Sequence, residues 1–291
     1  MPAMIQPNLT GLHRLTNSFG GDTYRAFVSG TEVVLKYRTD RRPLAVTQSV
    51  SHLLELRGCV VQTVELPLHP VQDGWLLGLK WLEGHTLSSG LLNAYSPGRR
   101  FQLGNELAHL VETMHSFSPR SSHWVVRVES RLERKRRQAL ELEALTISDT
   151  KNIDECWGRV RHSLIDVKES LIHRDLHPAN VLVLDDGSIC AIDLENARFA
   201  DPIYDLVKVR DLILRLDADF ADGFRDTLGI LRWNRTEWER FRAVCILEYI
   251  SAVVYHARRG ESLLASARRL SLLTICDMNT LEIRRSLCGD S

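Results

Sequence analysis

The sequence predicts an α+β fold with two lobes: a smaller N-terminal lobe with an antiparallel sheet and a helix, and a larger, mostly helical C-terminal lobe. Strand-like segments and tight turns dominate residues 1–79, whereas amphipathic helical patterns dominate residues 80–291. Hydrophobic residues make up 44% of the 291-residue chain and charged residues 25%, which suits a globular protein large enough for two cores. We therefore expect a domain boundary at residue 80.

The composition limits the partners and the location. The net charge is zero, so no whole-molecule field favours nucleic acid or a membrane as a partner. The chain starts with neither a basic nor an apolar block, and no apolar run approaches the roughly 18–20 residues that span a bilayer. Scattered cysteines without metal-ligand spacing predict reduced thiols in a cytoplasmic protein, at Cys59, Cys156, Cys190, Cys245, Cys276 and Cys288.

The N-terminal lobe begins with a predicted hairpin. Val33–Tyr37 alternates in the manner of a strand, and the Ser29–Gly30 turn pairs it with Thr23–Val28. Further elements are predicted for this lobe: a helix, a strand and a second apolar strand, at residues 44–57, 60–66 and 75–79.

Two stretches of this lobe suit a nucleotide. Backbone N–H groups could approach phosphates at a glycine turn, and Lys36 could pair with them. That turn would be formed by Ser18, Gly20 and Gly21, for which an ordinary hairpin turn is the alternative. The base would lie beside the linker at Lys80 and Leu82 and bond to its backbone. Residues 1–79 are therefore predicted to bind the nucleotide.

The C-terminal lobe carries three predicted helices before its most distinctive motif. Apolar residues recur at helical spacing in Phe101–His115, Trp124–Leu145 and residues 153–171. The second helix contains five basic residues between positions 131 and 137, offset by one acid. Such a run is typical of a solvated helix face, although it could also bind an anion.

The motif consists of Asp175, Asn180 and Asp193. Residues 181–184 and 189–192 are apolar strands joined by an Asp-Gly turn, so a hairpin should return Asp193 to the vicinity of Asn180. Asp175 could then accept the proton of an attacking hydroxyl, while the other two side chains hold Mg²⁺ on the phosphates of a nucleotide. The spacing favours metal-assisted phosphoryl transfer.

The motif also carries a family resemblance. The chain resembles the aminoglycoside phosphotransferase and choline kinase group of small-molecule kinases, which have a protein-kinase-like fold. His173–Asn180 is similar to their catalytic loop, Ile192–Glu195 to their metal-binding segment, and Asp201–Leu206 to the segment that follows. The resemblance covers residues 12–215 in the expected order.

The resemblance implies an enzyme that uses ATP and Mg²⁺ to phosphorylate a hydroxyl group. Asp175 would be the base, Asn180 and Asp193 the Mg²⁺ ligands, and Lys36 the phosphate-contacting lysine. Supporting roles would fall to His173, which we expect to bond backbone near Asp193, and to Arg174, His177, Glu195 and Asp205. Asp205 would order the catalytic loop, with a plain first-turn role in a helix as the alternative.

Three features depart from the family pattern. Arg174 replaces the usual Gly, as in protein kinases, but seven residues separate Asp193 from Asp201, too few for an activation loop. The helix after Lys36 offers Thr47 and Gln48 where a Glu should fix the lysine. The glycine loop is also short. An ordinary protein kinase is therefore disfavoured, and the lysine's acidic partner is left open.

The acceptor is the least determined part of the function. Ten arginines, no lysine and six acids occur between Arg232 and Arg285, which disfavours a polycationic acceptor and suits an anionic or neutral one. A small metabolite or antibiotic is the first expectation. The alternatives are Ser/Thr of a peptide in natural-product biosynthesis, or an inactive nucleotide-binding member of the fold.

Overall fold

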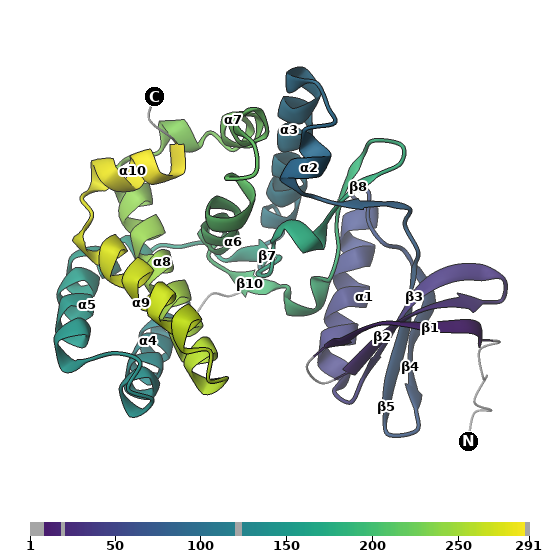
Figure 1. Cartoon of the computed structure of the whole chain (residues 1–291), viewed down its shortest axis with the longest axis horizontal. Coiled ribbons are helices and arrows are strands. Elements are labelled where there is room, and N and C mark those ends of the chain that lie inside the picture. The colour runs from purple at the N-terminus through teal and green to yellow at the C-terminus, as the bar shows by residue number, and fades with distance from the viewer. Residues whose placement is uncertain (1–8, 19–20, 120–123, 289–291) are drawn as a thin grey trace. The chain divides into compact units, whose positions relative to one another are not determined.

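The computed structural model describes residues 9–18, 21–119 and 124–288. The chain divides into two compact units, and each is described by itself. The first contains Met1–Met114, His173–Arg198 and Leu216–Phe224, and the second contains His115–Ile172, Phe199–Arg215 and Arg225–Ser291. A sheet dominates the first unit and helices dominate the second, so the predicted α+β fold is confirmed (Figure 1).

The first unit begins with a five-stranded antiparallel sheet of order β1-β2-β3-β5-β4. Its strands are β1 (Leu9–Ser18), β2 (Gly21–Val28), β3 (Thr31–Arg38), β4 (Val64–Val71) and β5 (Gly74–Lys80). Ser29 and Gly30 both have positive φ, as the predicted two-residue hairpin turn requires. The strand expected at residues 60–66 begins only at Val64, because Val60 and Val61 precede the sheet instead of pairing in it.

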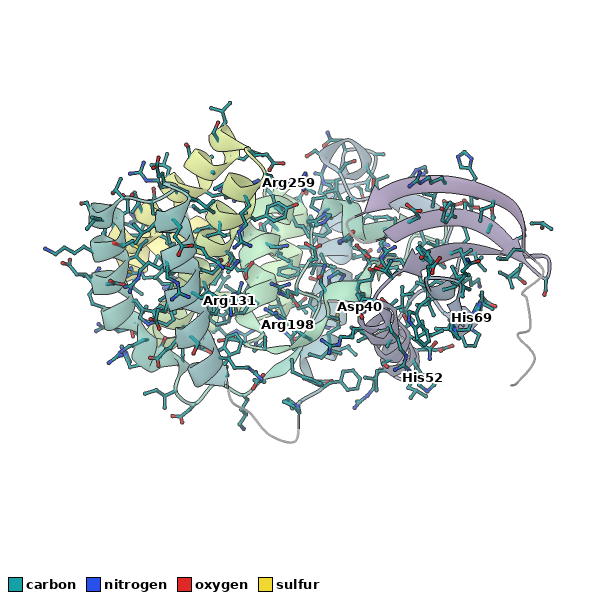
Figure 2. All side chains as sticks on the ribbon, turned by 90° about the horizontal axis from the view of Figure 1, so that it is seen from below. Asp40, His52, His69, Arg131, Arg198 and Arg259 are labelled. Atoms are coloured by element: carbon teal, nitrogen blue, oxygen red, sulfur yellow. The ribbon has the colours of Figure 1, made fainter. Side chains whose placement is uncertain are left out.

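Helix α1 (Arg41–Glu55) packs against this sheet (Figure 1). The side chain of Asp40, which is labelled in Figure 2, accepts a hydrogen bond from the Arg42 N–H and so caps the helix start. Leu44 of the helix joins Leu77 and Leu79 of β5 in one buried cluster. This packing fixes the strand that leads into the linker.

The rest of the first unit carries the catalytic motif. Strands β6 (Gly84–Thr86), β8 (Val181–Leu184) and β9 (Ile189–Ala191) form a small antiparallel sheet of order β6-β8-β9. Short 3₁₀ turns lie on either side of the β8–β9 hairpin, at Pro178–Asn180 and Leu194–Asn196. The hairpin predicted from the Asp-Gly turn is therefore present.

Two helices of the first unit approach closely through glycines. These are α3 (Pro97–His115, whose last residue belongs to the second unit) and the first part of α7 (Ala218–Thr227). A Cβ on Gly104 would lie 2.0 Å from the Phe220 carbonyl oxygen, and one on Gly223 would lie 2.0 Å from the Phe101 carbonyl oxygen. Only glycine fits at either position. A short helix, α2 (Ser89–Leu92), precedes α3.

The second unit is built around α8 (Arg235–Arg258), whose buried side chains include Phe241, Ile246 and Ile250. Helices of the same unit pack on it (Figure 1): α4 (Trp124–Glu141), α5 (Ile147–Val160), α6 (Ile203–Lys208), α9 (Ser262–Asp277) and α10 (Thr280–Cys288). Strands β7 (Ser170–Ile172) and β10 (Arg198–Ala200) pair with each other. None of the helices in the described ranges is long and apolar enough to cross a membrane.

The helix predicted for residues 153–171 is wrong in extent. Helix α5 starts earlier, at Ile147, because Thr146 and Asp149 form a capping box. It ends at Val160, and a 3₁₀ turn (Arg161–Leu164) follows. Ser170–Ile172 is a strand with all three residues buried, so the helical spacing of its leucine was coincidental. Helix α4 also ends before the predicted Leu145, and Glu143 there has a positive φ.

Candidate active site

The catalytic loop is held by the ring of His173, which is fully buried. Nδ1 accepts a hydrogen bond of 3.3 Å from the Asp175 N–H, so the ring hydrogen resides on Nε2, which donates to the Ile192 carbonyl at 2.9 Å. The ring therefore joins the residue that carries the expected base to the residue that precedes Asp193. Between the two loop residues, Arg174 adopts a left-handed backbone with φ 69°.

The Asp175 carboxylate is 27% exposed and lies beside two polar side chains. Asn196 Nδ2 donates to Oδ2 at 3.4 Å, and His177 Nε2 lies 3.9 Å from Oδ1. The carboxylate is thus oriented and still accessible to a substrate hydroxyl. A base needs this combination, since it must reach the proton that it accepts.

The β8–β9 hairpin brings Asn180 next to the residue before Asp193. The Ile192 N–H donates to the Asn180 carbonyl at 2.9 Å, and Val181 lies opposite Ala191 in the register. The Asn180 side chain donates through Nδ2 to the Asp175 carbonyl at 2.8 Å. This bond directs the side-chain NH₂ of Asn180 toward the main chain of Asp175 and leaves the side-chain oxygen Oδ1 to act as an acceptor or ligand.

Lys36 of β3 reaches the same place. Its Nζ donates to Asp193 Oδ1 at 2.6 Å and to Glu195 Oε1 at 2.8 Å, and its side chain is only 6% exposed. Burial raises the pKa of the Asp193 carboxyl, but its basic neighbours, Lys36 foremost through its charge and hydrogen bond, together outweigh burial, so this pKa lies below its ordinary value. Asp193 is consequently an anion at neutral pH.

Asp193 is held in an uncommon backbone conformation, with φ 63° and ψ 56°. A non-glycine residue in this left-handed region is strained, and such strain clusters at functional sites. The conformation starts the 3₁₀ turn at Leu194–Asn196, which places Glu195 beside Lys36. Local strain and the charge cluster thus occur at the same residue.

The donor set suits a hard cation. Asn180 offers an amide oxygen, and Asp193 and Glu195 offer carboxylate oxygens; oxygen ligands of this kind are preferred by Mg²⁺. The part of the chain that the structure describes contains no cluster of three or more His, Cys, Asp or Glu side chains suited to a metal. Mg²⁺ in nucleotide sites completes its coordination with phosphates and water, so two protein ligands are sufficient.

The linker after β5 has a definite hydrogen-bonding pattern. The Lys80 N–H donates to the Thr63 carbonyl at 2.8 Å, and the Lys80 carbonyl accepts from Gln62 Nε2 at 3.3 Å. A carbonyl oxygen has two lone pairs, so Lys80 can accept one more bond. The Leu82 N–H has no backbone acceptor within the described ranges. Both groups can therefore form a further hydrogen bond, as the role expected of the linker requires.

The predicted glycine turn is described only in part. Gly20 lies outside the described residues, while Ser18 ends β1 and Gly21 opens β2, where the two are paired. A Cβ on Gly21 would lie 2.0 Å from the Tyr37 carbonyl oxygen and 2.7 Å from the side chain of Arg38. Glycine is required here by neighbouring protein atoms, whatever a phosphate adds.

Asp205 belongs to the second unit. It lies in the first turn of α6 with its side chain buried, and its Oδ2 is 3.1 Å from His115 Nε2. The expected hydrogen bond from Asp205 to the catalytic loop stays a prediction.

Arg38 and Asn196 belong to the site but are not apparent as site residues from the sequence alone. Arg38 donates through Nε and Nη2 to the two oxygens of Glu195, at 2.8 and 2.7 Å. Arg38 could be inferred from Lys36, because residues two apart on a strand face the same side of the sheet. Asn196 lies beside Asp175 only because of the turn after Asp193, which the sequence does not reveal.

Comparisons with known proteins agree with this fold. Residues 20–244 match the family model described as "Phosphotransferase enzyme family". No curated protein matches the chain. Among solved structures, the chain is similar to a thermostable mutant of aminoglycoside phosphotransferase APH(4)-Ia in complex with AMP-PNP and hygromycin B. The identity is 16%, with a TM-score of 0.69, and the match covers 97% of this chain and 96% of that chain.

Two further structures are similar over nearly the whole chain. ADP-bound APH(2'')-Ib has 15% identity, covers 93% of this chain and 96% of its own, and gives a TM-score of 0.68. The gentamicin complex of APH(2")-IIa has 15% identity and a TM-score of 0.65, and the match covers 95% of this chain and 93% of that chain. At these identities the likeness establishes the fold, and the expected protein-kinase-like architecture is confirmed.

Proposed function

Because the chain belongs to the phosphotransferase enzyme family, we propose that it transfers the γ-phosphoryl group of ATP to a hydroxyl group of a small molecule such as an antibiotic or a metabolite. The observation that carries the proposal is the convergence on one hairpin. Asn180 bonds the Asp175 carbonyl at 2.8 Å, and Lys36 bonds Asp193 at 2.6 Å. A base, two oxygen ligands and a cation for phosphates are thereby assembled.

Each residue has one task in this proposal. Asp175 accepts the proton of the acceptor hydroxyl as the hydroxyl oxygen attacks the γ-phosphorus and the bond to the β-phosphate oxygen breaks. Lys36 neutralises phosphate charge. The Lys80 carbonyl and the Leu82 N–H match the hydrogen-bonding edge of adenine, which offers an amino donor beside a ring-nitrogen acceptor.

Asn180 and Asp193 would hold Mg²⁺, which supplies charge neutralisation and alignment of the phosphates. Asn180 is suited to this by its side-chain oxygen Oδ1, since its side-chain NH₂ group is the one that donates to the Asp175 carbonyl. Asp193 is suited by its lowered pKa, which keeps it anionic. Proteins of the same fold have been solved with AMP-PNP or ADP, which supports a nucleotide in this one.

The arginines of the second unit give less guidance on the acceptor than their number suggests. Several form ion pairs with acids of the same unit: Arg131 with Glu248, Arg240 with Asp201, Arg259 with Glu261, Arg268 with Asp211 and Arg269 with Asp149. Arg131 and Arg259 are labelled in Figure 2. Charges neutralised in this way neither attract an anion nor repel a polycation strongly.

The proposal is tested by following MgATP consumption with a panel of hydroxylated compounds. The panel should include aminoglycosides, neutral sugars, nucleosides and a Ser/Thr peptide, with the phosphorylated product identified by mass spectrometry. We expect product from a small molecule with the wild-type protein and not with Asp175→Asn. Phosphorylation of the peptide alone would replace the small-molecule proposal with the peptide alternative, and absence of transfer to any acceptor despite MgATP binding would favour the inactive alternative.

A further inference from the structure

The helix beside the sheet does not provide the acid that normally fixes a phosphate-binding lysine. Thr47 Oγ1 donates to the Pro43 carbonyl at 3.1 Å, and Gln48 Oε1 accepts from the Leu68 N–H at 2.7 Å. Both side chains are thus engaged away from Lys36. We propose that Glu195 orients Lys36 instead, and that Arg38 is the positioning residue that holds Glu195 for this task. The inference rests on the proposed function.

The Glu195 carboxylate accepts hydrogen bonds from both Lys36 and Arg38. Oε1 accepts from Lys36 Nζ at 2.8 Å and from Arg38 Nη2 at 2.7 Å, while Oε2 accepts from Arg38 Nε at 2.8 Å. The guanidinium therefore grips both oxygens as a fork, which fixes the plane of the carboxylate. A carboxylate held in this plane presents one oxygen to Lys36.

Arg38 is itself held by the β2–β3 hairpin. Its Nη1 donates to the Asp22 carbonyl at 3.0 Å and to the Tyr37 carbonyl at 2.7 Å. The residue is 5% exposed, and Gly21 packs so closely on it that a Cβ would lie 2.9 Å from Nη1. The Arg38 side chain thus forms hydrogen bonds to the end of β3, to the start of β2 and to the Asp193–Asn196 turn.

The arrangement has a functional consequence. Lys36 now bonds two carboxylates, Asp193 and Glu195. When Asp193 acts as a ligand in the loaded enzyme, Glu195 still holds the ammonium, so Lys36 stays directed at the phosphates. Two cations and two anions also make the cluster neutral, which reduces the cost of burying it. Arg38 acts through Glu195 and need not touch the nucleotide.

A double-mutant cycle tests this coupling, with MgATP affinity measured by calorimetry. Arg38→Met and Glu195→Gln should each weaken MgATP binding about tenfold, the effect of losing one charge-assisted hydrogen bond. In a Lys36→Met background each should change affinity by less than about twofold, because the residue through which they act is gone. Arg38→Lys, which keeps the charge without the fork, should recover part of the loss.

Exposed Arg42 provides the matched control, and Arg42→Met should leave binding unchanged. Equal losses for Glu195→Gln in both backgrounds would overturn the lysine-orienting role and favour direct contact with the metal or nucleotide. Equal losses for Arg38→Met in both would reduce Arg38 to a structural role.

A second measurement needs no nucleotide, so it separates this inference from the proposed function. Brief acetylation read by mass spectrometry compares buried Lys36 with exposed Lys80 as an internal standard. Arg38→Met and Glu195→Gln should raise relative Lys36 modification, whereas Arg42→Met should not. If wild-type protein binds no MgATP but Arg38→Met still unmasks Lys36, the proposed function fails and the positioning contact stands. Unchanged Lys36 modification in Arg38→Met overturns the inference.

Discussion

The side-chain amide of Asn180 donates to the main-chain carbonyl of Asp175 at 2.8 Å. This bond joins the expected metal ligand to the residue that carries the expected base, within a loop of six residues. Positioning of groups relative to each other is the main contribution that a protein makes to phosphoryl transfer.

Asp175→Asn should lower turnover by about 10²–10⁴-fold, the usual worth of a positioned general base. The substitution keeps the shape of the side chain and its neighbour Asn196, so nucleotide affinity should survive. Steady-state rates with the identified acceptor, together with MgATP titration, measure both effects. Wild-type rates in this variant would show that the base is another group.

Asp193→Ala should abolish Mg²⁺-dependent nucleotide binding. The substitution removes a carboxylate whose lowered pKa keeps it charged, and it leaves Lys36 with one acidic partner. Calorimetry with ATP, in the presence of Mg²⁺ and of excess chelator, gives the metal-dependent part of the affinity. If MgATP bound as tightly as in the wild type, Asp193 would not be a ligand.

His173→Phe should destabilise the first unit by about 1–3 kcal/mol for each of the two backbone groups that lose a partner. The Ile192 carbonyl and the Asp175 N–H both bond the buried ring, and phenylalanine offers neither donor nor acceptor. Thermal denaturation measures the loss. His109→Phe, on an exposed face of α3, is the control, and equal effects in the two variants would contradict the prediction.

Asp149→Asn should destabilise the second unit in a pH-dependent way. Burial raises the pKa of Asp149, but bonds from Arg269 and Thr146 outweigh it, so the folded pKa lies below the ordinary 3.8. Because the pKa of Asp149 is lower in the folded state than in the unfolded state, the charged carboxylate stabilises the fold above pH 3.8. This stabilisation disappears as the pH falls through the pKa of the folded state.

The difference in melting temperature between wild type and Asp149→Asn should therefore be largest near neutrality and shrink in acid. At neutral pH the loss should be about 1 kcal/mol, the usual worth of a helix cap. Exposed Asp166 serves for comparison, and Asp166→Asn should have little effect at any pH. A difference that does not vary with pH would argue against the ion pair with Arg269.

Gly104→Ala should destabilise the protein by about 1–3 kcal/mol or more, because its Cβ would overlap the Phe220 carbonyl. Gly98 lies in the same helix with nothing within 4 Å of a built Cβ. Gly98→Ala should instead stabilise by up to about 1 kcal/mol through helix propensity. Chemical denaturation of both variants checks the opposite signs, and a loss in both would assign the effect to glycine content alone.

The sequence predicts those features that depend on local pattern. The Asp-Gly turn at Asp186 and Gly187 indicates the β8–β9 hairpin, and the Ser29–Gly30 turn indicates the β2–β3 hairpin. The extent of a helix is less predictable. Apolar residues continue at helical spacing beyond Val160, so the predicted helix includes residues that form a buried strand in the structure. The Thr146 capping box was a readable signal that would have corrected its start.

The acidic partner of Lys36 could not be predicted, because it depends on how two distant segments meet. The helix residues Thr47 and Gln48 identify only a missing acid, whereas Glu195 takes its place through the turn that begins at Asp193. No local pattern specifies a left-handed aspartate, and no spacing in the sequence brings residues 36 and 195 together. Tertiary structure alone supplies that pair.

The left-handed backbone at Asp193 implies a trade-off between stability and activity. An L-residue there costs about 1–3 kcal/mol that glycine would not. Glycine would relieve this backbone but would remove the ion pair with Lys36 and, under the proposed function, an Mg²⁺ ligand. Stabilised versions of this protein should therefore gain their improvements elsewhere.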